Sequence, residues 1–138
     1  MAAWLFKTEP SEFSFADLKA MKTARWDGVK NATALIHLRT VKAGDTVVVY
    51  HTGNEKCAVG LAKVVRAPYP DPAHDDPKLV VVDLEAGAAL PAPVPLAAFR
   101  ADPLLAGTDL IRITRLSIVP LTAAQLKRVR KLAAASRA

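Results

Sequence analysis

The segment Arg25–Asn31, with the sequence RWDGVKN, gathers side chains that could recognise a nucleic-acid base. Trp26 is one of only two tryptophans in the chain, and a base can stack on an aromatic face. Asn31 carries both a donor and an acceptor, which suits the hydrogen-bonding edge of a base. The residues alone leave a second interpretation open, in which Trp26 closes one end of a barrel and Asn31 only caps a helix.

Cations that could hold phosphate accompany this segment. The formal net charge is +6, and from Arg112 to the end the chain has seven Lys or Arg and no acid. Lys7, Lys30 and Arg115 could contact the backbone of a nucleic acid, with Thr8 and His51 adding short polar groups. In the C-terminal segment we expect phosphate contacts from Lys127, Arg128 and Lys131.

Two further groupings could do catalytic chemistry. Cys57 and His51 could act as nucleophile and base, but Cys57 begins an apolar run, where a lone cysteine usually packs as a small core residue. Asp71, His74 and Asp75, in the loop DPAHDD, could bind a metal ion and support a metal-dependent hydrolase, although an acidic loop punctuated by prolines is usually only solvated. The chain has no G-x-S-x-G, phosphate-binding glycine loop or H-E-x-x-H motif, so we expect no enzyme, metal or cofactor.

Length and composition predict a cytoplasmic protein with a single domain over residues 1–138. The chain is 51% apolar and 23% charged, as expected for a globular domain. Its single cysteine excludes an internal disulfide framework and fits a reducing compartment. Charged Lys7 and Glu9 follow the start too closely for a signal peptide, and no apolar run approaches the roughly 18 residues of a membrane span.

Local patterns place these side chains on short elements. Ser14 and Asp17 form a capping box ahead of a helix whose inner face would hold Phe15, Leu18 and Met21. Gly60, inside a strand, indicates a bulge or a close backbone approach. Strands are expected at 3–7, 46–51, 57–67, 78–86 and 115–122, and helices at 15–21, 32–40 and about 122–134, the last capped by Thr122 and Gln125. Residues 25–30 are expected to be irregular, 68–77 to form a loop, and the proline-rich stretch from residue 90 to be neither helix nor central strand, with a helical turn after Pro95.

About five strands joined by short turns, with scattered helices, predict an α+β fold built on a curved, mainly antiparallel sheet or small barrel. Five segments also stand in the order and spacing of one known family: WLFKTEP, WDGVKN, VVVYHT, VGLAKVVRAPYPDP and TRLSIVP. The sequence from Trp4 to about Val119 thereby resembles the EVE domain family of the PUA-like superfamily. The resemblance implies a PUA-like β pseudo-barrel with flanking short helices.

The resemblance also implies a function. EVE domains are thought to be non-enzymatic DNA-binding or RNA-binding readers. They take a modified base, such as a methylated or hydroxymethylated cytosine, into a pocket. An RNA-binding module for modified or structured RNA is the alternative. A reader without an effector domain would act by occupancy or through an effector protein partner. By resemblance, the pocket would draw on Lys7, Thr8, Glu9, Trp26, Gly28, Val29, Asn31, Tyr50, His51, Arg115, Leu116 and Ser117.

Two positions depart from the family pattern. Ala32 stands where an aromatic residue often follows the asparagine, and Lys30 stands where arginine is usual. Lysine lacks the planar, bidentate donor pair with which arginine holds a phosphate. These differences predict a wider or weaker pocket than in other members.

Overall fold

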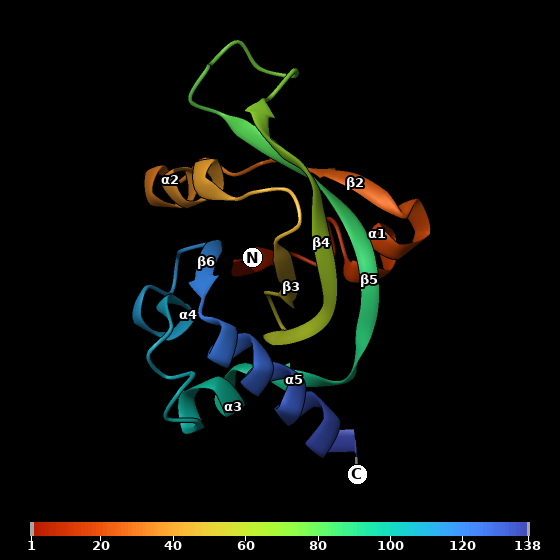
Figure 1. Ribbon diagram of the computed structural model, residues 1–138, viewed down its shortest axis with the longest axis vertical. Helices are drawn as coiled ribbons and strands as arrows, with labels where there is room; N and C mark the ends of the chain where they lie inside the picture. The colour runs from red at the N-terminus through yellow and green to blue at the C-terminus, as the bar shows by residue number, and fades with distance from the viewer. Residues whose placement is uncertain (1, 138) are drawn as a thin grey trace.

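The structure, a computed structural model, describes residues 2–137, with side chains described as far as residue 135. Strands and helices alternate irregularly along the chain, in an α+β arrangement (Figure 1). The strands are β1 (Ala3–Thr8), β2 (Thr23–Trp26), β3 (Thr46–His51), β4 (Cys57–Pro70), β5 (Val80–Pro95) and β6 (Ile118–Leu121). The helices are α1 (Phe15–Met21), α2 (Ala32–Thr40), α3 (Leu96–Ala101), α4 (Asp109–Arg112) and α5 (Ala123–Arg137). None of these helices is long and apolar enough to cross a membrane.

One six-stranded sheet organises the described residues, in the order β2-β5-β4-β3-β1-β6. Every neighbouring pair is antiparallel except β1 and β3, which run parallel in the register Leu5 to Val48. The prediction of a mainly antiparallel sheet is confirmed. Because β1 has partners on both edges, its side chains are buried on both faces, and Leu5 and Phe6 are fully buried.

The sheet curls until distant strands meet, as a pseudo-barrel requires. Three strands separate β2 from β1 in the sheet order, which corresponds to about 19 Å in a flat sheet. Nevertheless the ring centroids of Trp26 on β2 and Phe6 on β1 lie 5.7 Å apart. The strong curvature of β4 and β5 is visible in Figure 1. The inside of the curl is therefore the hydrophobic core.

The predicted helix caps are present. Ser14 and Asp17 form the capping box of α1, and Asn31 caps α2 by accepting a hydrogen bond from the backbone of Ala34 at 3.0 Å. Thr122 and Gln125 exchange the same reciprocal bonds ahead of α5. Such caps satisfy backbone donors that have no partner inside the helix, so local sequence determines where these helices begin.

Several expectations were wrong. Residues 23–26 form strand β2, because pairing with β5 overrides the weak local signal. The strand β4 continues to Pro70, so the loop begins at Asp71 and not at residue 68. Met21 does not face inward, since it is 57% exposed. The helix α4 was not expected at all.

The proline-rich stretch is also part of the sheet, because β5 continues to Pro95. Leu96 donates its N–H to Lys56 beside β4 at 2.9 Å. Prolines at alternate positions 91, 93 and 95 therefore place their missing N–H groups on the opposite edge. On that edge of β5, the described residues provide a strand partner only where β2 pairs, opposite Val82 to Glu85. The prolines lie beyond this pairing, on a free edge where a missing N–H is tolerated. The predicted helical turn after Pro95 is confirmed as α3.

Gly60 marks the close approach that the sequence predicted. A Cβ atom at this position would overlap the ring of Phe15, and the β4 register shifts on either side of it. We expect Gly60→Ala to lower the free energy of unfolding by about 1–3 kcal/mol, because a packed ring must move. Gly107→Ala is the matched control, since its nearest contact would be 3.9 Å away, and it should change stability by less than about 0.5 kcal/mol. Denaturant titration measures both, and equal effects would contradict the packing explanation.

Candidate nucleic-acid interface

A cavity of about 540 Å³ lies at the carboxyl end of β1. Its walls come from the end of β1, helix α1, strand β2 with the segment that follows it, and the residue before β6. Seven of the predicted site residues line it: Lys7, Thr8, Glu9, Trp26, Gly28, Val29 and Ser117. Gly28 has a φ of +79°, a conformation that favours glycine, and it turns the chain away from β2 along the cavity wall.

Trp26 belongs to the core and to the cavity at once. It is only 6% exposed, and its ring packs against Phe6 and edge-on against Phe13 at 6.0 Å. A ring buried to this extent offers a base a limited area for contact. The indole therefore packs in the core and also lines the cavity, and base stacking on Trp26 stays a prediction.

Two charged groups at the end of β1 are held in fixed positions. The Lys7 ammonium donates to the carbonyl of Thr114 at 2.8 Å, and burial lowers the pKa of Lys7 from its ordinary value. The Glu9 carboxylate accepts from the backbone and hydroxyl of Ser11 and from the hydroxyl of Thr52. The hydrogen bonds from Ser11, first that of its backbone, lower the pKa of Glu9. An ionised carboxylate and an ammonium thus line the same cavity.

Other lining residues were not among the predicted site residues: Glu12, Phe13, Met21, Ala24, Arg25 and Asp27. Arg25 and Asp27 flank Trp26 in the sequence, so their proximity to it was the available signal. Phe13 directly precedes the cap residue Ser14, a position typical of a packing residue. The exposed Met21 is an adaptable apolar side chain beside the cavity. Asp27 and Glu9 are two carboxylates that line this one cavity.

The other predicted pocket residues lie elsewhere. The side chain of Asn31 is occupied as the cap of α2. Tyr50 is buried against Phe99 of α3, and burial raises its pKa to about 12. Leu116 is a core residue that is 1% exposed, and Arg115 is exposed outside the cavity lining. These four residues belong to the family motifs in the sequence, but the fold does not place them in the cavity lining.

His51 supports the wall of the cavity from behind. Its Nε2 accepts the backbone N–H of Phe15, the first residue of α1, at 3.0 Å. The ring proton is therefore on Nδ1, which donates to Glu55 at 2.8 Å. With both nitrogens engaged, His51 positions α1 and does not reach a ligand.

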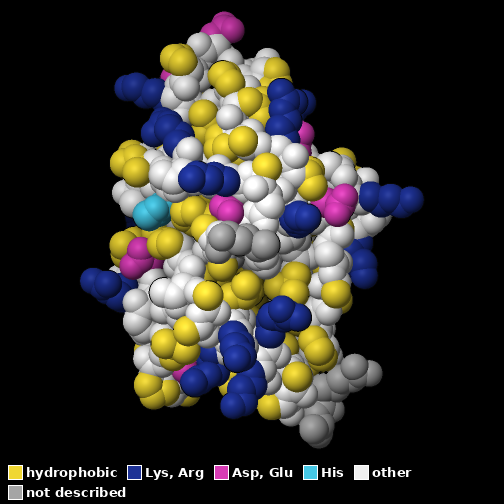
Figure 2. All heavy atoms as spheres, viewed as in Figure 1, with side chains coloured by type: hydrophobic (Ala, Val, Ile, Leu, Met, Phe, Trp, Pro, Cys, Tyr) yellow, Lys and Arg dark blue, Asp and Glu magenta, His cyan; other side chains and the backbone are white. Residues whose placement is uncertain are grey.

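Lys30 and the three predicted phosphate contacts of the C-terminal segment fall on two surfaces. Lys30 lies beside α2, whereas Lys127 and Lys131 lie on α5 at the edge of a second groove. Arg128 is held by Asp102 at 2.7 Å, so its guanidinium is already paired. Figure 2 shows Lys and Arg side chains both over the upper part of this face, which bears α2, and over the lower part, which bears α5.

The catalytic alternatives lack the necessary geometry. In residues 2–137 no three His, Cys, Asp or Glu side chains come together as metal ligands. Asp71 is buried and accepts the backbone N–H of Ala73, and its distance to His74 is 3.9 Å. Cys57 stands opposite His51 in the β3–β4 register. However, burial raises the pKa of the Cys57 thiol, which disfavours the nucleophilic thiolate.

A curled sheet with a cavity at the end of β1 gives this chain a PUA-like fold. An ASCH protein of Zymomonas mobilis shares the fold with a TM-score of 0.57 at 11% sequence identity. The chain belongs to the EVE domain family, which matches residues 2–132. The family resemblance drawn from the five sequence segments is thereby confirmed.

Relatives cover most of the chain. Human thymocyte nuclear protein 1 is 32% identical over 153 residues, spanning 86% of this chain and 68% of that protein. The mouse protein is 36% identical over 108 residues, 59% of this chain and 48% of its own length. The chain thus spans about half to two thirds of these curated relatives.

Solved structures agree along nearly the whole chain. A Rhodopseudomonas palustris protein solved by NMR has a TM-score of 0.92 at 39% identity, covering 98% of this chain and 94% of that chain. Human THYN1 in complex with 5-methylcytosine-containing DNA has a TM-score of 0.88 at 31% identity, covering 96% of this chain and 98% of that chain.

The Asp102–Arg128 pair predicts an acid-dependent loss of stability. The hydrogen bond from Arg128, with backbone N–H groups of Leu104 and Leu105, lowers the pKa of Asp102. A carboxyl whose folded pKa is lowered stabilises the fold above its unfolded value of about 4, and this contribution disappears as pH falls through the folded value. Asp102→Asn should therefore lower the midpoint of thermal unfolding at pH 7, with the difference from the parent shrinking below about pH 4.

The control is Asp109→Asn, because Asp109 lies 4.0 Å from an Arg112 side chain that is 70% exposed. Exposed pairs of this kind contribute little, so its unfolding midpoint should stay near that of the parent. If Asp102→Asn lowered the midpoint of thermal unfolding by the same amount at every pH, the ionised carboxylate of Asp102 would not be the source of the stabilisation.

Proposed function

We propose that this chain is a non-enzymatic reader of nucleic acid, DNA in the first instance, that accommodates a methylated or hydroxymethylated cytosine in the cavity beside Trp26. The observation that carries the proposal is one cavity at the end of β1, lined by an aromatic ring, a hydrogen-bonded ammonium and carboxylates. Its volume of about 540 Å³ is within the range of small-molecule sites, about 300–1,000 Å³. The complex of human THYN1 with 5-methylcytosine-containing DNA supports the same ligand class.

The polar groups suit the hydrogen-bonding edge of cytosine. Its exocyclic amino group is a donor, and carboxylates are its usual protein acceptors. Glu9 and Asp27 both line the cavity and can accept from it. Lys7 has donors for the acceptor atoms of the base or for the adjoining phosphate. Glu9 is already bonded to Ser11 and Thr52, so Asp27 is the more available acceptor.

Entry into the cavity requires a base outside the stack. Taking a base from a duplex costs a few kcal/mol, whereas a single strand avoids most of this cost. A base stacked fully on an aromatic ring gains about 1–3 kcal/mol. With Trp26 only 6% exposed, we expect a contribution of about 1 kcal/mol, at the lower end of that range. Polar contacts must therefore provide the remainder.

Binding titrations test the ligand class. Oligonucleotides carrying one cytosine, 5-methylcytosine or 5-hydroxymethylcytosine should be compared as single-stranded DNA, duplex DNA and RNA. A buried methyl contributes about 0.8 kcal/mol, so 5-methylcytosine should bind about fourfold more tightly than cytosine. Preference for RNA would indicate contacts to the 2′-hydroxyl. Equal affinity for all three bases in every format would refute the proposal.

A pair of tryptophan variants separates the cavity floor from the core. Trp26 and Trp4 are each 6% exposed, but only Trp26 lines the cavity. We expect Trp26→Leu to weaken binding of the 5-methylcytosine oligonucleotide by about fivefold, the equivalent of about 1 kcal/mol. Trp4→Leu should lose stability, together with the hydrogen bond of its indole to Asp45, and keep its affinity. Titrations below the unfolding range, with circular dichroism to verify folding, decide between a cavity role and a core role for Trp26.

The absence of catalysis is a separate part of the proposal. DNA and RNA incubated with the protein and magnesium, manganese or zinc should remain intact, because the described part of the chain brings together no metal cluster and burial disfavours the thiolate of Cys57. Gel analysis of the products measures this. Cleavage that disappears in His74→Ala or Asp75→Ala would instead establish the hydrolase alternative.

A further inference from the structure

A second hollow adjoins the proposed base site. It has a volume of about 540 Å³ and lies between α2 and the loop that leads into β5. Gly28 and Val29 line the base cavity, while Lys30 and Ala32 line this hollow. One short segment of chain is thus a wall of both, so a strand leaving the base cavity reaches this hollow next. We call it the α2 groove, lined by Lys30, Ala32, Leu35, Ile36, Arg39, Asp76, Lys78 and Leu79.

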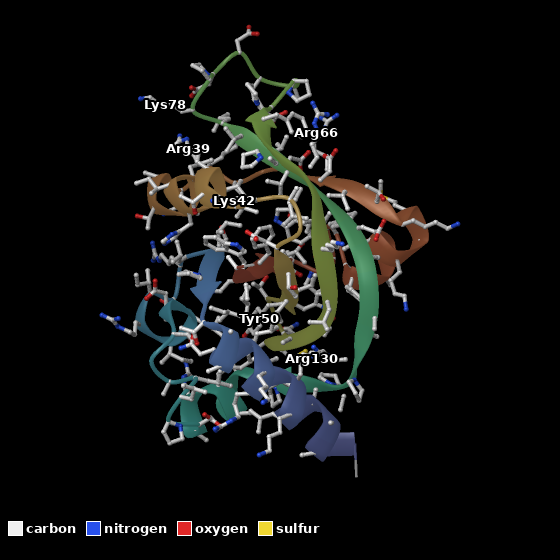
Figure 3. The ribbon with its side chains drawn as sticks, viewed as in Figure 1. Arg39, Lys42, Tyr50, Arg66, Lys78 and Arg130 are labelled. Carbon is white, nitrogen blue, oxygen red and sulfur yellow. The ribbon has the colours of Figure 1, made fainter. Side chains whose placement is uncertain are left out.

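Cations outnumber acids in the α2 groove. Lys30, Arg39 and Lys78 are exposed and line it. Arg39 donates to the backbone carbonyl of Lys78 at 2.8 Å, which links α2 to the loop, and Figure 3 shows the two side chains close together at this end of the molecule. Asp76 is the one acid in the lining, and its carboxylate accepts the backbone N–H of Lys78 at 2.9 Å. That hydrogen bond already occupies one oxygen of the carboxylate.

The floor of the α2 groove is apolar. Ile36 on α2 is 58% exposed, and Leu35 and Leu79 lie beneath it in the lining. Phosphate contacts from cations position a nucleic-acid backbone, and an apolar floor can contact the sugars between the phosphates. Cations around an apolar floor are therefore complementary to a sugar–phosphate chain.

The α5 cations occupy a different place. Lys127, Arg130 and Lys131 line a groove with residues of β4 and β5. Neither this groove nor the α2 groove shares a lining residue with the base cavity, but of the two only the α2 groove has a lining that continues directly in sequence from the cavity lining, from Val29 to Lys30. In Figure 1 the α2 helix is in the upper half of the molecule and α5 in the lower half. Because a single view removes depth, α2 and α5 are at least as far apart in space as they are in this picture. A backbone continuing from the base cavity into the α2 groove runs away from α5.

We infer that the α2 groove is the phosphate-binding track for the strand that flanks the base, with Lys30, Arg39 and Lys78 as its contacts. This inference rests on the proposed reader function. Of Lys30 and the three α5 residues that the sequence predicted as phosphate contacts, it keeps Lys30 alone. It assigns two further residues, Arg39 and Lys78. The α5 cations take no part in nucleic-acid binding.

The salt dependence of binding tests the inference. The parent, Lys30→Gln/Arg39→Gln/Lys78→Gln and the matched control Lys127→Gln/Arg130→Gln/Lys131→Gln should be titrated with duplex DNA carrying 5-methylcytosine at several salt concentrations. Each phosphate contact contributes about 0.9 to the slope of log affinity against log salt. The α2 variant should lose about 2.7 of slope, and the control less than about 1. The ratio of affinities for methylated and unmethylated DNA should stay unchanged in both.

Arg39 also connects α2 to the loop, so the triple variant could unfold. The double variant Lys30→Gln/Lys78→Gln leaves that link intact and should lose about 1.8 of slope. A parent slope retained in the α2 variants, or an equal or larger loss in the α5 control, overturns the track. If the parent protein binds methylated and unmethylated DNA equally well, the reader function is refuted instead. This affinity ratio is measured independently of the salt slopes, so the two failures can be told apart.

Discussion

The burial of β1 between two neighbours is the constraint on which the rest of the structure depends. Its backbone is hydrogen-bonded to β3 on one edge and to β6 on the other, and Leu5 and Phe6 are fully buried. At its carboxyl end, Lys7 donates its N–H to Ser117, and Thr8 accepts the N–H of Thr52. The end of β1 is therefore held on both edges by backbone hydrogen bonds. This fixes the backbone from which the charged groups of Lys7 and Glu9 reach the cavity.

Trp26 connects that strand to the opposite end of the sheet. Its packing on Phe6 requires the sheet to curl, and its remaining edge becomes part of the cavity floor. A tryptophan committed to the core has little surface left for a ligand. Under the proposed reader function, the polar neighbours that distinguish Trp26 in the sequence consequently have a larger share of recognition than the ring itself.

Features with a local cause could be predicted from the sequence. The caps at Ser14, Asn31 and Thr122 follow from hydrogen bonds within one turn of helix, and Gly60 follows from the exclusion of a side chain. The strand β2 and the proline-bearing part of β5 could not be predicted, because each depends on which sheet edge is free.

The candidate site likewise contains some features that the sequence could predict and others that it could not. Residues that motif order singled out at the end of β1 and around Trp26 line the cavity. It did not reveal that Tyr50 and Leu116 point into the core, or that His51 is occupied by α1. Phe13 and Met21 reach the cavity only because α1 folds against β2, and no local pattern encodes that contact.

The parallel pairing of β1 with β3 also has a consequence for the order of folding. Residues 9–45 connect the two strands and include α1, β2 and α2. Closing so long a connection costs chain entropy before any hydrogen bond between the strands forms, and non-local pairing of this kind slows folding. Ten of the thirteen residues that line the cavity lie within this connection. The candidate site and the pairing of β1 with β3 therefore both depend on closing the same long connection.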